Sequence, residues 1–390
     1  MRPEPHGGVL VDRPLVGRDD VLAALLWGAR RTVARTLPSA AVVIAEAGHG
    51  KSHLGQVLLD QLGAIDLRAE VIDLRARPPE YGDADRTLRE LLQRALGVPS
   101  AAPPEAARAL LDQRLGPERS AVDTAILAFS LGWIGAGAPE LRALVAAPGA
   151  LRPAMVTAAG EALRRRARRG PIFVVLDDAH HADETTMAAL EYATLAEAGA
   201  PIWICALGRP LFEEAYPSWG DRAASREVHR LGPLDPASAA KLCRKLLLPA
   251  DSVPEPAVAR LVARTQAVPL LLVELVRGLK RAGVVRRNPR GESWFLATDE
   301  LDQLPGLPLI EWLAQTELDQ LSPSLRAHAR LVALLGGDAT GAEIDGVLRL
   351  LDQSGAAIDL PLDARVGMRR LLAAGQIGRA SCRERVCVPV

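Results

Sequence analysis

Ala45-Glu-Ala-Gly-His-Gly-Lys-Ser52 is the stretch of sequence that decides the fold. It follows the short apolar run 40–45, typical of a buried strand, and precedes the helical pattern 54–62. Gly48 and Gly50 permit backbone angles and a close approach that a side chain would block. The amides of such a loop point inward at the start of a helix and form a cradle for an anion. The spacing therefore predicts a phosphate-binding loop, or P-loop.

Each polar group of this loop has a task in binding ATP and Mg²⁺. Lys51 is expected to reach the β- and γ-phosphates, and the Ser52 hydroxyl to bind Mg²⁺. Ala45 stands where the usual pattern has glycine, which is a tolerated variant. The alternative interpretation is a glycine-containing turn between a strand and a helix. The nucleotide-binding residues predicted in the loop are Ala45, Glu46, Ala47, Gly48, His49, Gly50, Lys51, Ser52 and His53.

A second motif, Phe173-Val-Val-Leu-Asp-Asp178, is an apolar strand that ends in two carboxylates, as a Walker B strand does. Asp177 is predicted to hold Mg²⁺ through water, and Asp178 to orient the water that attacks the γ-phosphate. A strand followed by a helix capped near Asp183 is the plainer interpretation, and both can hold at once. Together with the upstream P-loop, this motif predicts nucleotide binding.

A third motif, Ile202-Trp-Ile-Cys-Ala-Leu-Gly-Arg209, is a strand that ends in arginine. Such a cation can sense the γ-phosphate from a neighbouring strand. The alternative is a surface arginine in an ordinary ion pair. The predicted catalytic residues are therefore Lys51, Asp178 and Arg209, and the predicted metal ligands are Ser52 and Asp177.

Short apolar runs alternate with amphipathic helical patterns up to about residue 210, which predicts an α/β fold with a parallel sheet. The runs are 40–45, 171–176 and 201–206, with a weaker one at 69–74. Residues 83–170 are too many for one crossover, and we interpret them as a helical insertion. After Pro210 the strand signal fades and helical patterns dominate. The predicted organisation is a flexible tail at 1–14, a P-loop domain at 15–212 with its insertion at about 83–170, a helical lid at 213–304 and a partial winged-helix and helical region at 305–376.

Composition excludes several classes of protein. The chain of 390 residues has a formal net charge of zero, so no global field favours nucleic acid or a membrane surface. No run approaches the about 18 apolar residues that a membrane span needs, and the N-terminus lacks the apolar core of a secretory signal. The four cysteines form neither a disulfide nor a zinc pattern, so we expect a cytoplasmic protein.

Two local features need separate interpretations. Arg164-Arg-Arg-Ala-Arg-Arg169 could touch nucleic-acid phosphates, but a solvated helix end, where cations suit the dipole, explains it more simply. His180 and His181 beside Asp183 suggest a metal site only weakly. The segment from Ile377 to the end resembles the translation of a sequencing adapter, so we interpret 377–390 as an artefact and expect the natural chain to continue differently.

Taken together, these motifs and several further ones resemble those of the STAND class of AAA-related ATPases, notably the ATP-binding module of large bacterial LuxR-type regulators. Leu15-Val-Gly-Arg-Asp-Asp20 is similar to the family's N-terminal motif, with Asp19 in place of glutamate. Asp177-Asp-Ala-His-His-Ala-Asp183 is similar to its extended Walker B, which usually has tryptophan at the position of His181. Gln266-Ala-Val-Pro-Leu-Leu-Leu-Val-Glu274 is similar to its lid segment, with Ala267 in place of glycine. Further matches are Arg209-Pro210, Leu231-Gly-Pro-Leu234 and Leu321-Ser-Pro-Ser-Leu325.

The resemblance implies a switch in which ATP or ADP sets the arrangement of the domains. It places Val16, Gly17 and Arg18 near the adenine and ribose, and Pro269 over the base. The expected function is an ATP-binding signalling switch with slow hydrolysis, within a larger transcription regulator. We expect DNA binding only through a missing C-terminal domain. Self-association of the chain is a further alternative. The alternatives are an ATP-binding module without turnover and an origin-recognition-like ATPase that acts on DNA.

Overall fold

The computed structural model describes residues 15–77, 84–116, 120–250, 253–287, 294–303, 322–335 and 341–353, with a few single positions beyond residue 303 and the short strands β8 and β9. The chain divides into two compact units. The first contains the residues up to Leu248 together with Pro254–Val273, and the second contains Pro249–Val253 and the residues from Glu274 onward. The predicted tail 1–14 and most of the regions 305–376 and 377–390 lie outside the described residues.

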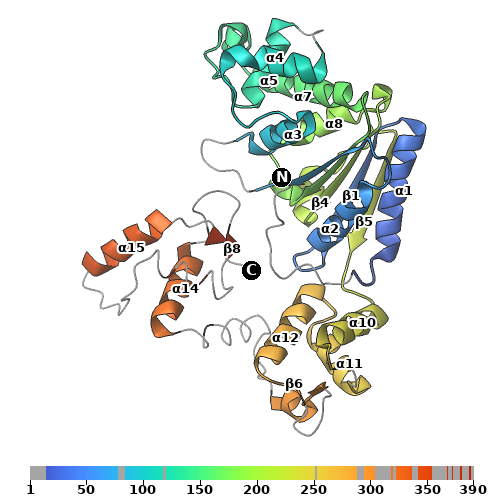
Figure 1. Ribbon diagram of the computed structural model, residues 1–390, viewed down its shortest axis with the longest axis vertical. Helices are drawn as coiled ribbons and strands as arrows, with labels where there is room; N and C mark the ends of the chain where they lie inside the picture. The colour runs from blue at the N-terminus through green and yellow to red at the C-terminus, as the bar shows by residue number, and fades with distance from the viewer. Residues whose placement is uncertain are drawn as a thin grey trace. The chain divides into compact units, whose positions relative to one another are not determined.

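A five-stranded parallel sheet forms the centre of the first unit, in the order β2-β3-β4-β1-β5 (Figure 1). The central strands β1 and β4 are buried at every residue, as expected of a parallel sheet covered on both faces. The predicted α/β fold with a parallel sheet is confirmed. The strands are β1 (Ser39–Ala45), β2 (Glu70–Arg75), β3 (Ile172–Asp177), β4 (Ile202–Gly208) and β5 (Ser225–Leu231).

Each face of the sheet has its own hydrophobic core, because successive residues of a strand point to opposite faces. On one face, Val43, Phe173 and Cys205 pack under the helices α1 (Asp19–Arg35) and α2 (Lys51–Leu62). On the other face, residues such as Val42 and Val174 pack under α3 (Arg86–Leu96), α7 (Leu151–Ala167) and α8 (Glu184–Ala193). The sheet is therefore rigid, and its ends are fixed platforms for loops.

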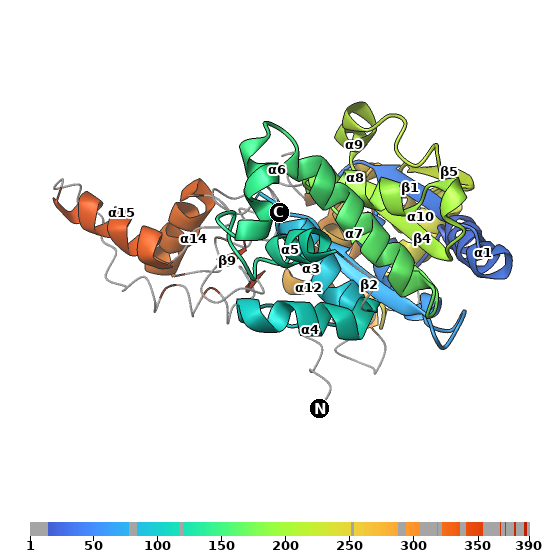
Figure 2. The same cartoon turned by 90° about the horizontal axis from the view of Figure 1, so that it is seen from above.

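The long connection between β2 and β3 is helical, as Figure 2 shows from above. Besides α3 and α7 it contains α4 (Pro104–Leu115), α5 (Ala121–Ser130), the 3₁₀ turn η1 (Pro139–Leu141) and α6 (Arg142–Ala146). Their apolar residues, among them Leu111, Leu127 and Leu163, join the core on that face of the sheet. This is the segment interpreted above as a helical insertion.

A fifth strand follows Pro210, in the part of the sequence where the strand signal fades. After the short helix α9 (Pro210–Ala215), β5 pairs with β1 along its whole length, from Ser225 beside Ser39 to Leu231 beside Ala45. As an edge strand it is only half-buried, so its sequence, Ser-Arg-Glu-Val-His-Arg-Leu, contains no apolar run. The sheet thus extends beyond the domain boundary predicted at residue 212.

Three helices follow the sheet: α10 (Pro236–Leu247), α11 (Glu255–Arg264) and α12 (Pro269–Arg281). The division between the two compact units falls inside α12, after Val273. The second unit adds a hairpin that sequence patterns did not predict, and then further helices. Its elements are β6 (Val285–Arg287), β7 (Trp294–Leu296), η4 (Thr298–Gln303), α14 (Pro323–Leu335), α15 (Gly341–Gln353), β8 (Gly378–Arg379) and β9 (Val386–Cys387). Among the described helices, none combines the length and apolarity that crossing a bilayer requires.

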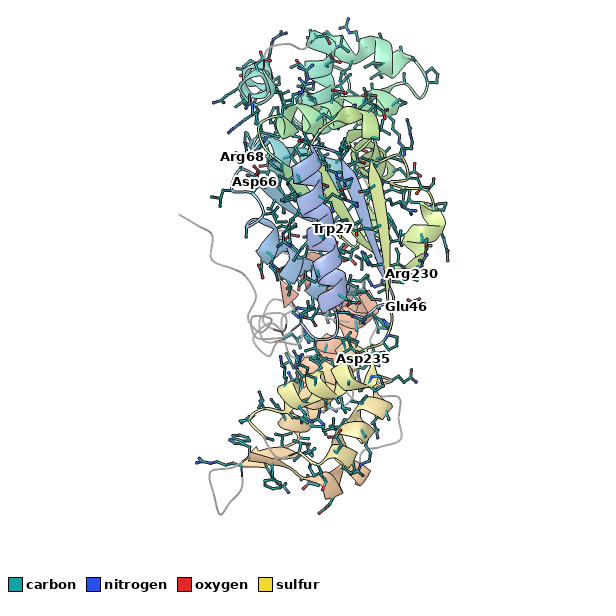
Figure 3. All side chains as sticks on the ribbon, turned by 90° about the vertical axis from the view of Figure 1, so that its right-hand side faces the viewer. Trp27, Glu46, Asp66, Arg68, Arg230 and Asp235 are labelled. Atoms are coloured by element: carbon teal, nitrogen blue, oxygen red, sulfur yellow. The ribbon has the colours of Figure 1, made fainter. Side chains whose placement is uncertain are left out.

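Phe173→Ala should lower the free energy of unfolding by about 3–5 kcal/mol, because it empties a fully buried site in the sheet. The Phe173 ring packs edge-on against Trp203, with 6.3 Å between ring centroids. Urea unfolding followed by circular dichroism measures the change. Trp27 is the control: it is 57% exposed on α1 (Figure 3), so Trp27→Ala should cost less than about 1 kcal/mol. Equal losses for the two variants would contradict the described core.

Candidate functional site

The P-loop lies at the carboxyl end of the central strand β1 and leads directly into α2. Gly48 and Gly50 adopt left-handed backbone angles, with φ of 80° and 92°, which explains why these positions need glycine. Gly50 is also the residue that precedes the first turn of α2. His49 lies between them, with its Nδ1 3.2 Å from the Ala47 carbonyl oxygen. The loop thus has the strand–loop–helix geometry that the sequence predicts.

Lys51 is the first residue of α2, and its side chain turns back into the loop. The residue is only 7% exposed. Its Nζ donates to the carbonyl oxygen of Ala45 and, at 2.9 Å, to that of Glu46. Burial lowers the pKa of Lys51, and the nearby Arg209 lowers it further, while neighbouring carboxylates act in the opposite direction. A buried ammonium group that donates, among the described residues, to carbonyl oxygens alone is well suited to receive phosphate oxygens.

Ser52, the residue after Lys51, contacts Asp177 at the end of β3. The Ser52 hydroxyl donates to the Asp177 carboxylate, and the Asp178 amide donates to the same carboxylate at 2.9 Å. Burial is the largest effect on Asp177 and raises its pKa, which the Ser52 hydrogen bond partly offsets. Hydroxyl and carboxylate oxygens are the ligands that Mg²⁺ takes from proteins beside phosphates and water. The side-chain atoms present at this point therefore fit Mg²⁺.

Asp178 is engaged by a residue that the sequence patterns missed. Its carboxylate accepts a hydrogen bond from Nε of Arg75 at 3.0 Å. Arg75 is the last residue of β2 and pairs in register with Asp177 of β3. Asp178 itself has a left-handed φ of 54°, uncommon for a residue other than glycine. The only signal that could have identified Arg75 is the adjacency of β2 and β3, because their carboxyl ends then lie side by side.

Arg209 directly follows β4 and precedes α9. Its charge acts on both Lys51 and His180, so it lies at the same edge of the sheet as the P-loop lysine. Within the described part of the chain, its guanidinium forms no ion pair. The ordinary ion pair that would make it a mere surface arginine is therefore absent from those residues.

The N-terminal segment before α1 contacts the start of α10. Val16 is buried, and Gly17 has a φ of 69° and lies so close to Ser238 that a Cβ would come within 2.6 Å of it. Arg18 donates to the carbonyl oxygen of Gly232. Burial lowers the pKa of Arg18, whereas Asp20 and Asp235 raise it. Asp235, which caps α10, is labelled in Figure 3.

Pro269 is the first residue of α12, and the residue after it touches the P-loop. The Leu270 amide donates to the Gly48 carbonyl oxygen at 3.1 Å. Immediately before, Gln266 and Ala267 both adopt left-handed angles, with φ of 51° and 57°. Ala267 thus occupies a conformation that favours glycine, the residue that the family pattern has there.

The structure brings most of the predicted site residues to one edge of the sheet. Lys51, Ser52, Asp177, Asp178 and Arg209 surround the end of the P-loop. Glu46 and Ala47 are exposed, and His53 is half-buried in the first turn of α2. Val16, Gly17 and Arg18 instead join α10, and Pro269 comes close to the loop through its neighbour Leu270.

Two other sequence features have structural explanations. In the basic run, Arg164 pairs with Glu161 at 3.0 Å and Arg166 with Glu70 at 2.8 Å, so both cations are engaged within the protein. Asp183 caps α8 by accepting from the Thr186 amide at 2.7 Å. Its carboxylate is therefore occupied, and no group of three potential metal ligands gathers among the described residues.

Comparisons with known proteins agree with this geometry. The family model of the AAA ATPase domain matches residues 14–204, which include the P-loop and the strand that ends in Asp177. The expectation of an AAA-type P-loop module is thereby confirmed, although the match ends before Arg209 and the lid helices. No curated protein sequence matches this chain significantly.

Solved structures show similarity at low identity. The ORC1 protein of Aeropyrum pernix in complex with DNA is 18% identical, with 97% of this chain and 91% of that chain covered and a TM-score of 0.45. Drosophila ORC bound to DNA is 14% identical, with 98% and 86% covered and a TM-score of 0.48. A signal transduction ATPase with numerous domains (STAND) and a tetratricopeptide repeat sensor, from Pyrococcus horikoshii, is 12% identical, with 92% and 53% covered and a TM-score of 0.36.

Lys51→Ala should weaken ATP binding strongly, because it removes the one buried ammonium group at the end of the P-loop. Hydrogen bonds to charged groups contribute about 1.5–3 kcal/mol each, so a loss of at least about tenfold in affinity is expected. Isothermal titration calorimetry with ATP in magnesium buffer measures the loss. Lys241→Ala, which removes an exposed lysine of α10, should leave the affinity unchanged. Tight binding by Lys51→Ala would refute the P-loop assignment.

Arg75→Ala should raise the rate of ATP hydrolysis without changing ATP affinity, because it frees the Asp178 carboxylate. The Arg75 side chain is 69% exposed, and an exposed ion pair contributes only about 0–1 kcal/mol, so the gain should not exceed about fivefold. Arg68→Ala is the matched control: it breaks the pair between Arg68 and Asp66 (Figure 3), away from the P-loop. A gain that persists when Asp178→Ala is added would show that Asp178 does not mediate it.

Proposed function

We propose that this protein, whose residues 14–204 match the family model of the AAA ATPase domain, is an ATP-driven signalling switch with slow hydrolysis. We further propose that it acts in the cytoplasm as part of a larger bacterial transcription regulator of the LuxR type. Contact with DNA would then come through a domain outside this chain, and the chain itself would respond to the exchange of ADP and ATP.

The observation that carries the proposal is the hydrogen bond between the Leu270 amide and the Gly48 carbonyl oxygen, 3.1 Å long. Gly48 belongs to the loop expected to surround the phosphates, whereas Leu270 belongs to the first turn of α12. A nucleotide that rearranges the loop therefore acts directly on this helix. The helix α12 continues beyond Val273 into the second compact unit. A movement of the P-loop at Gly48 is therefore passed along this helix to residues outside the nucleotide-binding unit.

The proposed binding mode assigns a task to each polar group at the edge of the sheet. Lys51 holds the β- and γ-phosphates, and Ser52 and Asp177 hold Mg²⁺, whose charge offsets that of the phosphates. Arg209 faces the γ-phosphate, so that the site binds ATP and ADP with different affinities. The segment Val16, Gly17 and Arg18, together with Pro269, borders the adenine and ribose. A ligand that contacts both the P-loop and the lid segments would favour one arrangement of them over another.

A second candidate, a binding module without turnover, is favoured by the ion pair between Arg75 and Asp178. A carboxylate that accepts from a guanidinium at 3.0 Å has less capacity left to orient water. The exposure of Arg75 argues that this engagement is weak and reversible. The origin-recognition-like alternative has no such support: the net charge is zero, and Arg164 and Arg166 are engaged within the described protein.

Hydrogen exchange of the Leu270 amide tests the switch directly, because that amide reports its bond to Gly48. We expect the peptide covering 266–273 to exchange at different rates with ADP and with a non-hydrolysable ATP analogue in magnesium buffer. Lys51→Ala should remove the difference, because it removes nucleotide binding. Peptides from α7, in the helical insertion, provide the control and should exchange equally in both states.

Identical exchange of 266–273 in the two states, with binding of both nucleotides shown by calorimetry, would reject the switch but leave a nucleotide-binding protein. Absence of any saturable nucleotide binding by the wild-type chain would reject both.

A further inference from the structure

His180 lies in the 3₁₀ turn η2 (Ala179–His181), three residues after Asp177, which ends β3. Both of its ring nitrogens are buried, and neither has a hydrogen-bond partner in the described part of the chain. A buried polar atom without a partner costs about 1–3 kcal/mol, so such a group calls for an explanation. Neither the binding mode nor the hydrolysis step described above uses it.

The surroundings of His180 place it at the nucleotide-binding edge. The turn η2 packs against the end of β4 and against α9, the two elements that Arg209 joins. The titratable groups near the ring are those of His181, Asp178, Arg209 and Lys51. Burial, followed by the nearby His181, lowers the pKa of His180 to about 4. At neutral pH the ring is therefore uncharged, with one N–H donor and one acceptor nitrogen.

The backbone and one neighbouring ring hold His180 in place. The turn begins at Asp178, whose φ is 54°, and the His181 amide donates to the Asp178 carbonyl oxygen at 2.8 Å. The His181 ring lies against the His180 ring, with 4.1 Å between their centroids. A polar ring that is positioned in this way, yet unpaired among the described residues, is suited to a hydrogen bond with a bound ligand.

We propose that His180 donates a ring N–H to the γ-phosphoryl group of ATP and thereby helps the site to distinguish ATP from ADP. The proposal rests on the proposed function, because it requires ATP in the P-loop. The choice of the γ-phosphoryl group follows from the neighbours, because Asp178 and Arg209 are the groups assigned to that end of the nucleotide. The turn that contains His180 begins directly after Asp178 and contacts β4 and α9, the two elements that Arg209 joins. The γ-phosphoryl group is also the only part of ATP that ADP lacks.

Other roles fit these observations less well. A structural histidine in a core would have its nitrogens paired within the protein, which those of His180 are not in the described residues. A metal ligand would need further donors, but the carboxylate of Asp183 caps α8. A general base works best with a pKa near the working pH, whereas burial lowers the pKa of His180 to about 4.

The test compares ADP with adenylyl imidodiphosphate, a non-hydrolysable ATP analogue, by isothermal titration calorimetry on the full chain in magnesium buffer. For His180→Ala, affinity for the analogue should fall about tenfold, as expected for one hydrogen bond to a charged group, while affinity for ADP stays within about twofold. His229→Ala is the matched control, because it removes a half-buried ring of the same kind from β5 rather than from η2. It should leave the ratio of the two affinities unchanged.

A conservative variant separates hydrogen bonding from packing. The Asn side chain supplies N–H donors on a shorter stem, so His180→Asn should recover part of the lost preference for the analogue. A purely structural role of the ring predicts no such recovery. The analogue and ADP are measured on the same protein sample, so the ratio of the two affinities is independent of the fraction of protein that is folded. If His180→Ala does not fold, His180→Asn still tests the proposal.

An equal loss for both nucleotides, or no loss for either, would overturn the role of His180. Recovery by His180→Asn together with a normal ADP affinity supports it. A wild-type chain that binds ADP and the analogue, with a ratio that His180→Ala and His180→Asn leave unchanged, rejects only this inference. A wild-type chain that binds neither nucleotide rejects the proposed function itself.

Discussion

The buried ammonium group of Lys51, held by the carbonyl oxygens of Ala45 and Glu46, is the interaction on which the rest of the site depends. It fixes the first turn of α2 against the end of β1 and places a desolvated positive charge at the carboxyl edge of the sheet. In a parallel sheet every strand ends at that same edge. Charged residues that directly follow the other strands therefore lie close to the ammonium group of Lys51. The fold thus determines the electrostatics of the site before any ligand is considered.

The charges at this edge differ in how firmly they are held. Asp177 is half-buried and accepts from Ser52 and from a backbone amide, which suits a ligand of a metal ion. Asp178 instead pairs with Arg75, whose side chain is 69% exposed. An exposed pair contributes about 0–1 kcal/mol, less than the interactions of a buried group, so it is the contact that rearranges most easily. Adjacent carboxylates can therefore have different tasks, because their surroundings differ.

The lid segment contains a strained stretch of backbone that hydrogen bonds hold in place. Gln266 and Ala267 hold left-handed angles that cost an alanine about 1 kcal/mol. The conformation persists because the Leu234 amide donates to the Ala267 carbonyl oxygen at 3.0 Å and the Leu270 amide donates to Gly48. Backbone strain next to a loop that binds ligand is typical of elements with two accessible arrangements. This strain gives a physical reason to place the proposed switch at the joint between α11 and α12.

Sequence patterns predicted the parts of the fold that depend on local chemistry and missed those that depend on strand order. The four apolar runs are β1 to β4, whereas β5, a half-buried edge strand with Arg226, Glu227, His229 and Arg230, has no apolar run to recognise. Arg75 and Asp178 stand 103 positions apart, and only the pairing of β2 with β3 makes them neighbours. His180 belongs to the motif 177–183, but no sequence pattern indicates that its ring nitrogens are buried without a partner among the described residues, because this depends on how η2 packs against β4 and α9. A motif can therefore identify which loops bind phosphate, while the order of strands determines which side chains control what happens there.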